Sequence, residues 1–429
     1  MQIIELIEAT GAKVLAEVDK DLDVKISTDT RTIQKGDFYL PLKGASFDGE
    51  KFINQAFEKG AIGAFCTGDN GTLQVKDTLT AYLQLANYRR KKLNFTVVAI
   101  TGSSGKTTTK ELAASVLSEK FRTFKTPLNH NNEIGFCQTI FEAPDDTEIL
   151  VLEMGMRGLG EIELLSKYAE PDITIISNVG TAHIGRLGSR ENIAKAKCEI
   201  VKYQRGNIFI AHDDELIKKT VQFSGKKIFY SIKDVKILEK DTHYSKFEYY
   251  GNIYELNVGG DYNIENALSA INTGLALRMK VNEIQSGLKK YAPIEKRWEA
   301  VNAGGFEIIN DSYNANPESM RAFIDTIFEL YEKPVVILGD MGELGEDEIK
   351  YHSELGKYIN SHKNLRQDAE ILSIGKLSKY ITDGVTNCPA KHFETIEQAV
   401  DYIKNKDTKV QLFLKASRSM KFERIIEEL

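Results

Sequence analysis

The sequence predicts an α/β protein of three domains: a small mixed α/β domain, a central domain with a parallel sheet and a phosphate-binding loop, and a Rossmann-like α/β domain. Its 429 residues suit about three domains of ~150 residues each. From residue 95 onward, short apolar runs alternate with helical patterns, as in βαβ units of a mostly parallel sheet. This pattern breaks at Pro293 and then resumes. We therefore expect domains at 1–92, 93–296 and 297–429.

The expected elements follow in order along the chain. The first stretch is mixed α/β and ends in a basic helical segment, AYLQLANYRRKKLN. The strands expected in the central domain are the apolar runs FTVVAITG, EILVLEMG, ITIISNVG and NIFIAH. Those expected in the last domain are FEIINDS, PVVILGDM, EILSIG and VQLFLKAS, in the alternation that is typical of a doubly wound sheet.

Composition and charge limit the class of partner. A net charge of −6 with interspersed signs argues against nucleic acid or an anionic membrane surface, because both bind basic faces. No apolar run approaches the ~20 residues that span a bilayer, and the first residues do not resemble a signal peptide. Cys66, Cys137, Cys198 and Cys388 lack metal or redox spacing, so we expect free thiols and a cytoplasmic protein.

The segment VVAITGSSGKTTTK, residues 97–110, has the parts of a phosphate-binding loop. Backbone N–H groups of a glycine-rich turn bind anions, Lys106 adds positive charge, and the Thr107 hydroxyl suits Mg²⁺. The usual spacing has glycine where this chain has Ile100, so a plain Gly/Ser-rich turn with an exposed lysine is the alternative. The predicted nucleotide-binding residues here are Gly102, Ser103, Ser104, Gly105, Lys106, Thr107 and Thr108.

TGSSGKTTTK resembles the compact phosphate loop of the Mur ligases, ATP-dependent amide-forming enzymes of peptidoglycan synthesis that use Gly-x-x-Gly-Lys-Thr without the longer spacer. Further segments resemble this family over nearly the whole length: STDTRTIQKGDFYLPLKG, NHNNEIGFCQT, EMGMRGLGEIELL, NVGTAHIGRLGSRENIAKAKCEI, INDSYNANPESMRAFI, ILGDMGELGEDEIKYH and LKASRSM. The DSYNANP and GDMGELG runs resemble the branch that adds D-Ala-D-Ala.

The resemblance implies a reaction and its substrates. UDP-MurNAc-tripeptide would be joined to D-Ala-D-Ala through an acyl phosphate formed with ATP, and the family suggests a monomer. Alternatives are a family member that adds a single amino acid, a folate-polyglutamylating enzyme, and a nucleotide switch that uses its phosphate loop without ligation. The SYNANP run argues against the first two, and a switch leaves Lys197, His183 and STDTR unexplained.

Two Mg²⁺ ions are implied by the resemblance, with Thr107, Glu153, His183 and Lys197 as metal-binding residues. Glu153 ends the strand-like run ILVLE, and open α/β sheets bind ligands at the carboxyl ends of their strands. His183 follows the next run, where a structural histidine is the alternative. The catalytic residues that the resemblance implies are Lys106, Glu153, His183, Lys197 and Asn132.

Lys197 lies on an apolar stripe of its predicted helix. Ile193, Ile200 and Val201 lie at −4, +3 and +4 from it. An inward-facing ammonium is costly, so its stem either extends to water or the amine is changed. The resemblance implies the change, because this lysine matches one that CO₂ carbamylates in related ligases.

The remaining assignments come from the resemblance alone. For the nucleotide they are Asn263, Asn266, Arg297 and Asp311, the last of which closes over it from the third domain. For the uridine diphosphate end they are Ser27, Asp29, Arg31 and Gly44. Asn131 and Asn132 are expected near the γ-phosphate and the acyl group. For the dipeptide they are Asn314, Asn316, Arg321, Ser417 and Arg418.

Overall fold

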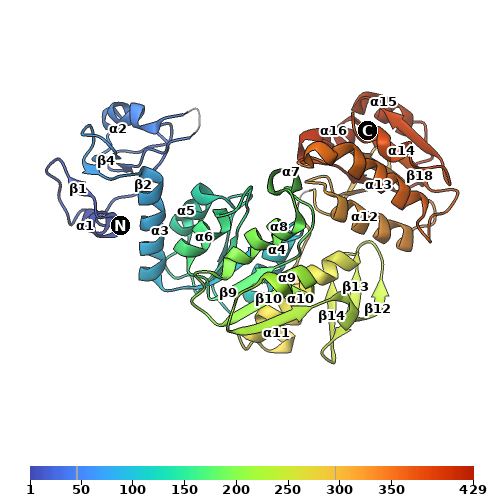
Figure 1. Ribbon diagram of the computed structural model, residues 1–429, viewed down its shortest axis with the longest axis horizontal. Coiled ribbons are helices and arrows are strands. Elements are labelled where there is room, and N and C mark those ends of the chain that lie inside the picture. The colour runs from blue at the N-terminus through green and yellow to red at the C-terminus, as the bar shows by residue number, and fades with distance from the viewer. Residues whose placement is uncertain (45–46, 295) are drawn as a thin grey trace. The chain divides into compact units, whose positions relative to one another are not determined.

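A computed structural model describes residues 1–44, 47–294 and 296–429 (Figure 1). The chain forms two compact units. One contains Met1–Phe95 and Thr126–Glu148, and the other contains Thr96–Lys125 and Ile149–Leu429. Helices and strands alternate in both units, so the predicted α/β class is confirmed.

The first unit holds a five-stranded sheet in the order β1-β5-β4-β3-β2. Its neighbouring strands are parallel except β1 and β5. The strands are β1 (Lys13–Val14), β2 (Ile26–Ser27), β3 (Phe38–Tyr39), β4 (Gly63–Cys66) and β5 (Leu73–Gln74). The helices are α1 (Ile3–Thr10), α2 (Ile53–Glu58), α3 (Thr78–Leu93) and α5 (Glu133–Glu142), with a 3₁₀ turn at Gly49–Phe52.

Residues 126–148 belong to the first unit although they follow the start of the second. Helix α5 packs on α3, with the rings of Tyr82 and Phe141 stacked at 5.5 Å. The Arg89 guanidinium on α3 donates to the Ala143 carbonyl at 2.9 Å and pairs with Asp145 at 2.8 Å. We predict 93–296 as one continuous domain from the sequence, and the boundaries near 93 and 297 stay a prediction.

The second unit begins with a six-stranded, fully parallel sheet in the order β11-β10-β9-β6-β8-β7. The four strands predicted for it are present, and β8 and β9 are buried along their whole length, as expected for a sheet covered on both faces. The strands are β6 (Thr96–Thr101), β7 (Thr123–Lys125), β8 (Ile149–Glu153), β9 (Ile173–Ile176), β10 (Ile208–His212) and β11 (Lys226–Tyr230).

Seven helices and a small antiparallel sheet accompany this parallel sheet in the described chain. The helices are α4 (Lys106–Leu117), α6 (Glu161–Ala169), α7 (Ile184–Leu187), α8 (Arg190–Cys198), α9 (Glu215–Thr220), α10 (Asp261–Ala276) and α11 (Val281–Lys290). The antiparallel strands are β12 (Lys236–Lys240), β13 (Ser245–Tyr249) and β14 (Asn252–Leu256). Short 3₁₀ turns lie at Glu199–Val201 and Ile232–Asp234.

A second six-stranded sheet has the order β15-β16-β20-β17-β18-β19 and is parallel except between β15 and β16. Its strands are β15 (Glu299–Ala303), β16 (Phe306–Asn310), β17 (Val335–Gly339), β18 (Glu370–Ile374), β19 (Ala390–Phe393) and β20 (Leu412–Lys415). Its helices are α12 (Pro317–Leu330), α13 (Glu348–Asn360), α14 (Lys379–Thr382), α15 (Ile396–Ile403) and α16 (Glu423–Glu428). Short 3₁₀ turns lie at Gly345–Asp347 and Arg418–Met420.

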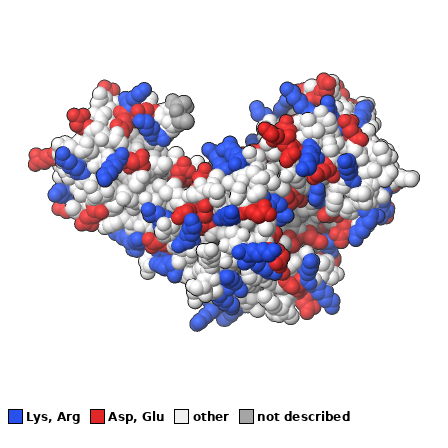
Figure 2. Space-filling view, in the orientation of Figure 1, with Lys and Arg blue, Asp and Glu red and all other residues white. Residues whose placement is uncertain are grey.

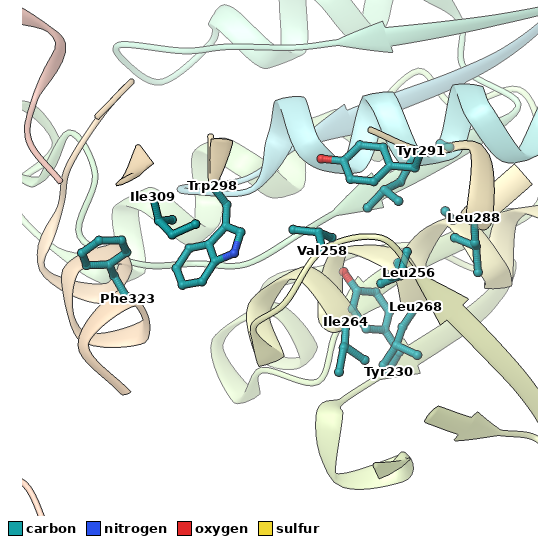
Figure 3. Close-up of a cluster of buried hydrophobic side chains, with 14 of the residues drawn as sticks. Tyr230, Leu256, Val258, Ile264, Leu268, Leu288, Tyr291, Trp298, Ile309 and Phe323 are labelled. Carbon is teal, nitrogen blue, oxygen red and sulfur yellow. The ribbon is translucent and has the colours of Figure 1, made fainter. Parts of the chain in front are cut away.

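One apolar cluster includes residues of both six-stranded sheets of the second unit. Trp298 lies within it, between Phe323 on one side and Val258 on the other (Figure 3). The Trp298 ring meets Phe323 edge-on at 5.7 Å, and its N–H donates to the Thr242 carbonyl at 2.8 Å. This single tryptophan therefore joins the two halves of the unit through packing and through a satisfied polar tip.

The surface in Figure 2 carries interspersed blue and red side chains, as the mixed charge of the sequence predicts. Within the described part of the chain, no helix combines the length and the apolar character that crossing a membrane requires.

Candidate active site

Three loops meet at the carboxyl edge of the parallel sheet. Strands β9, β6 and β8 are neighbours in that order. The phosphate loop follows β6, Glu153 ends β8, and the segment from Ser177 to His183 follows β9. Open parallel sheets bind ligands at this edge, so the arrangement has the place of an active site.

The phosphate loop is held by Asn178. The Asn178 Oδ1 atom accepts from the N–H groups of Ser103 and Ser104 at 3.1 and 2.9 Å, and its amide nitrogen donates to the Ser104 hydroxyl at 2.9 Å. The Ser177 hydroxyl donates to the Ser104 carbonyl at 2.6 Å. Because the N–H groups of Ser103 and Ser104 already donate to Asn178, the N–H groups that follow them, at the start of α4, are the ones that can bind an anion.

The N-terminus of α4 offers those groups. The Thr109 N–H donates to the Gly105 carbonyl at 2.8 Å, the first bond of the helical pattern. The N–H groups earlier in the first turn have no acceptor within the helix and can bind an anion. Thr107 and Thr108 are buried there, and Leu112, Val116 and Leu117 form the predicted apolar stripe behind them. The predicted strand, turn and helix are therefore all present, and the geometry suits a phosphate group.

Gly105→Ala is expected to weaken binding of a nucleoside triphosphate about tenfold or more, because left-handed backbone costs a side chain ~1–2 kcal/mol and a clash adds to this. Gly105 has φ +75°, and a Cβ there would lie 2.4 Å from Asn266 Oδ1. Gly160→Ala is the matched control, since Gly160 also precedes a helix at φ +85° but has open space around it. Titration calorimetry checks both, and parental affinity in Gly105→Ala would contradict the geometry.

Lys106, Glu153 and Lys197 lie close together. The Lys106 ammonium donates to the Gly102 carbonyl at 2.8 Å. Burial lowers the pKa of Lys106, the Glu153 carboxylate opposes this, and Arg297 adds to it. Burial also lowers the pKa of Lys197 well below its usual value, and the positive charge of Lys106 lowers it further.

The predicted orientation of Lys197 is confirmed. It is 1 % exposed on α8, whereas Lys195 and Lys202 are exposed. Ile193 and Ile200 are fully buried beside it. The side chain therefore points inward, as the helical period predicted.

The carboxylate of Glu153 lies against Lys110, one turn along α4 from Lys106. Lys110 Nζ is 3.7 Å from Glu153 Oε2 and 3.3 Å from Glu111 Oε1, and the Lys110 side chain is 1 % exposed. Glu111 in turn pairs with Lys125. The buried carboxylate is thus compensated by lysine charge, as burial of an ion requires.

His183 meets a carboxylate from the second sheet. Its Nδ1 atom lies 2.7 Å from Glu343 Oε2, and this contact is the largest cause that lowers the pKa of Glu343. The Gly185 N–H donates to the Glu343 carbonyl at 3.3 Å. His183 is therefore in contact with a residue far along the chain.

The four residues predicted for the nucleotide have different surroundings. Asn266 lies against the phosphate loop and accepts from the Thr109 hydroxyl at 3.2 Å, whereas Asn263 donates to the Gly259 carbonyl at 2.7 Å. The Arg297 guanidinium stacks on the Tyr313 ring at 3.8 Å. Asp311 pairs with the buried Lys415 and accepts from the backbone N–H of Trp298 at 3.2 Å.

The residues predicted for the dipeptide lie mostly at the carboxyl edge of the second sheet, where β16 and β20 are parallel neighbours. Asn314 and Asn316 follow β16, and Asn316 caps α12 by accepting from the Ser319 N–H at 2.9 Å. Ser417 and Arg418 follow β20. Arg321 lies further along α12, over the Tyr358 ring at 5.3 Å.

The remaining predicted residues lie in the first unit. Ser27 ends β2, Asp29 pairs with Arg31 at 2.6 Å, and the Gly44 N–H donates to the Phe47 carbonyl at 2.8 Å. Arg31 holds the pKa of Asp29 at about 2. Asn131 and Asn132 precede α5, and Asn132 caps it by accepting from the Gly135 N–H at 2.9 Å. Their predicted roles stay predictions.

The sequence matches two protein-family models: Mur ligase middle domain over residues 100–274, and Mur ligase, glutamate ligase domain over residues 296–418. A relative from Bacillus subtilis, UDP-N-acetylmuramoyl-tripeptide–D-alanyl-D-alanine ligase, is 37 % identical over 94 % of this chain and 92 % of its own. The chain belongs to the Mur ligase family.

Solved structures agree. MurF from Acinetobacter baumannii has a TM-score of 0.88 at 28 % identity, covering 100 % of this chain and 98 % of its own. MurF ligase from Thermotoga maritima in complex with ADP has a TM-score of 0.83 at 28 % identity, covering 94 % and 96 %. The predicted resemblance and the three-domain α/β fold class are confirmed.

Sequence reasoning did not assign Lys110, Asn178, Glu343 and Lys415 to the site. Lys110 and Lys415 are lysines inside otherwise buried segments, and that pattern was a usable signal. Asn178 was matched to the family, but only its contacts reveal that it organises the phosphate loop. Glu343 lies within the quoted GDMGELG run, where nothing local indicates a histidine 160 positions away.

Proposed function

We propose that the chain is an ATP-dependent amide ligase that joins UDP-MurNAc-tripeptide to D-Ala-D-Ala. The observation that carries the proposal is similarity over nearly the full length to a relative that bears this name. The site supports it, because a phosphate loop with Lys106 lies beside Glu153 and Lys197. The proposed activity belongs to the assembly of peptidoglycan precursors.

The chemistry has two steps. A carboxylate resists attack by an amine, so the tripeptide carboxylate first takes the γ-phosphoryl group from ATP, and ADP leaves. The amine of D-Ala-D-Ala then attacks the acyl carbon and forms the C–N bond. The bond between that carbon and the phosphate oxygen breaks, its electron pair leaves with phosphate, and the nitrogen loses a proton. Lys106 and the start of α4 would offset phosphate charge and align the reactants, which is how proteins accelerate phosphoryl transfer.

ATP use is supported by the ADP complex of the Thermotoga maritima ligase. Mg²⁺ fits the donor set of the Thr107 hydroxyl, the Glu153 carboxylate and the His183 imidazole. Among the described residues, no group of three or more His, Cys, Asp and Glu side chains could hold a metal alone. Proteins bind Mg²⁺ through one or two side chains together with substrate phosphates, so the phosphates of ATP would complete its coordination. When bound, the ions would neutralise phosphate charge.

Lys197 is proposed to act as a carbamate. The support is its position on the buried face of α8, between apolar side chains and near Lys106. Only a neutral amine reacts with CO₂, and burial beside another cation favours the neutral amine. The carbamate would present oxygen atoms, which hard cations prefer.

The substrate assignments follow the same proposal. Ser27, Asp29, Arg31 and Gly44 would hold the uridine diphosphate end, and the residues at the edge of the second sheet would orient the dipeptide. We further propose a monomer. The four cysteines are free thiols, which suits the cytoplasm.

Phosphate release is expected to be slow with ATP and UDP-MurNAc-tripeptide alone and to rise when D-Ala-D-Ala is added, because the amine completes the second step. A coupled phosphate assay measures this. Equal release without any co-substrate would instead indicate a nucleotide switch. Equal stimulation by D-Ala or L-glutamate would favour another branch of the family.

A further inference from the structure

The GDMGELG loop, residues 339–345, begins at the last residue of β17 and has no role in the proposed function so far. It is anchored within its own sheet, because Asp340 Oδ1 accepts from the N–H groups of Leu377 and Ser378 at 3.0 and 2.7 Å. The Gly342 N–H donates to the Ser417 hydroxyl at 2.8 Å. The loop is therefore a fixed platform.

This platform contacts the NVGTAHIG segment, residues 178–185. A Cβ on Gly185 would lie 2.6 Å from the Gly345 nitrogen, so two glycines permit the backbones to touch. The Gly185 N–H donates to the Glu343 carbonyl, and Glu343 Oε2 lies 2.7 Å from His183 Nδ1. The same segment holds the phosphate loop through Asn178.

His183 and Glu343 both adopt an uncommon backbone conformation, although the ion pair between them is expected to add little to the stability of the fold. His183 and Glu343 have φ +66° and +62°, a region that residues with a Cβ seldom occupy. Their side chains are 20 % and 49 % exposed, and exposed ion pairs contribute little to stability. Strained residues that meet in this way indicate a functional constraint.

We propose that Glu343 is the positioning residue for His183, and this rests on the proposed function. A carboxylate oxygen 2.7 Å from Nδ1 favours a proton on that nitrogen, which leaves Nε2 as the lone-pair nitrogen, the form that binds a metal. Mg²⁺ binding at His183 thereby depends on the loop that follows β17 in the second six-stranded sheet. The residues proposed for D-Ala-D-Ala belong to the same half of the unit.

A purely mechanical brace is the competing explanation. The structure provides a control for it, because Glu318 on α12 accepts from the Thr181 hydroxyl at 2.8 Å. This second contact joins the same segment to the same half of the unit but does not touch the His183 ring. Glu318→Ala removes this acceptor and should therefore weaken the brace while leaving the contact of Glu343 with the His183 ring in place.

The test is the affinity for ADP with and without Mg²⁺, measured by titration calorimetry on the full chain. Mg²⁺ should raise the affinity of the parent for ADP, and we expect Glu343→Ala to reduce this gain in affinity by ~10-fold or more. Loss of a residue that hydrogen-bonds to a metal ligand has an effect of this size. Affinity for ADP without Mg²⁺ should be unchanged. Glu343→Gln, which keeps an acceptor oxygen, should retain most of the gain in ADP affinity, and so should Glu318→Ala, which removes only the contact with Thr181.

The double variant separates the explanations further. His183→Ala should lose the Mg²⁺ gain, and adding Glu343→Ala should cause no further loss, because both act through one group. A full gain in Glu343→Ala, or an equal loss in Glu318→Ala, overturns the role of Glu343 and leaves the ligase proposal intact. No Mg²⁺ gain in the parent overturns both the metal assignment and the role of Glu343.

Discussion

Replacing Lys106 by alanine should lower kcat by ~10³-fold or more, because a preorganised charge is lost from the transferring phosphoryl group. The fold should survive. The Lys106 ammonium donates to the Gly102 carbonyl, and the residue lies at the start of α4, outside the apolar cluster. Steady-state kinetics measure the loss, and thermal unfolding checks the fold.

Lys195→Ala is the control for this variant, since Lys195 is an exposed lysine of α8. It should keep parental activity. Near-normal turnover by a folded Lys106→Ala would mean that TGSSGKTT is an ordinary turn, and the proposed nucleotide site would be wrong.

Lys197→Ala should lose at least ~10²-fold in kcat while remaining folded and able to bind ADP, because a group that holds the metal is removed but the phosphate loop is intact. Acetate or formate should restore part of the activity by supplying a carboxylate in the vacated space. Kinetics with and without these anions measure both effects.

The parent enzyme should respond to CO₂. Carbamate forms on the neutral amine and is lost in acid, so protein stripped of CO₂ at mildly acidic pH should lose activity and regain it with bicarbonate. Lys106→Ala should show no rescue by acetate, since it lacks a different group. More than about half of normal activity in Lys197→Ala would contradict the carbamate.

Much of the fold is readable in the sequence where strands are apolar along their whole length. ILVLE and ITII form β8 and β9. A strand that is covered on both faces has apolar residues at every position, and does not alternate apolar with polar residues. β7 and β11 were not predicted, since one is short and the other begins with two exposed lysines. The place of α5 in the first unit also escaped prediction, because it depends on pairs such as Tyr82 and Phe141, distant in sequence.

Some residues of the candidate site were also predictable from the sequence, and others were not. Lys197 was predicted to face inward from helical period alone, and it does. Lys110 beside Glu153 and Glu343 beside His183 depend on packing between separate elements, which no local pattern encodes. The roles of Asn131 and Asn132 came from resemblance, and the structure adds only that Asn132 caps α5.

The mass of the ligation product tests the central claim most directly. Incubation with ATP, Mg²⁺, UDP-MurNAc-tripeptide and D-Ala-D-Ala should give a product that is heavier than the tripeptide substrate by the dipeptide less one water, together with ADP and phosphate. Omission of any one substrate should abolish it. A parental protein that yields no such product, or that joins D-Ala or L-glutamate as readily, would contradict the account.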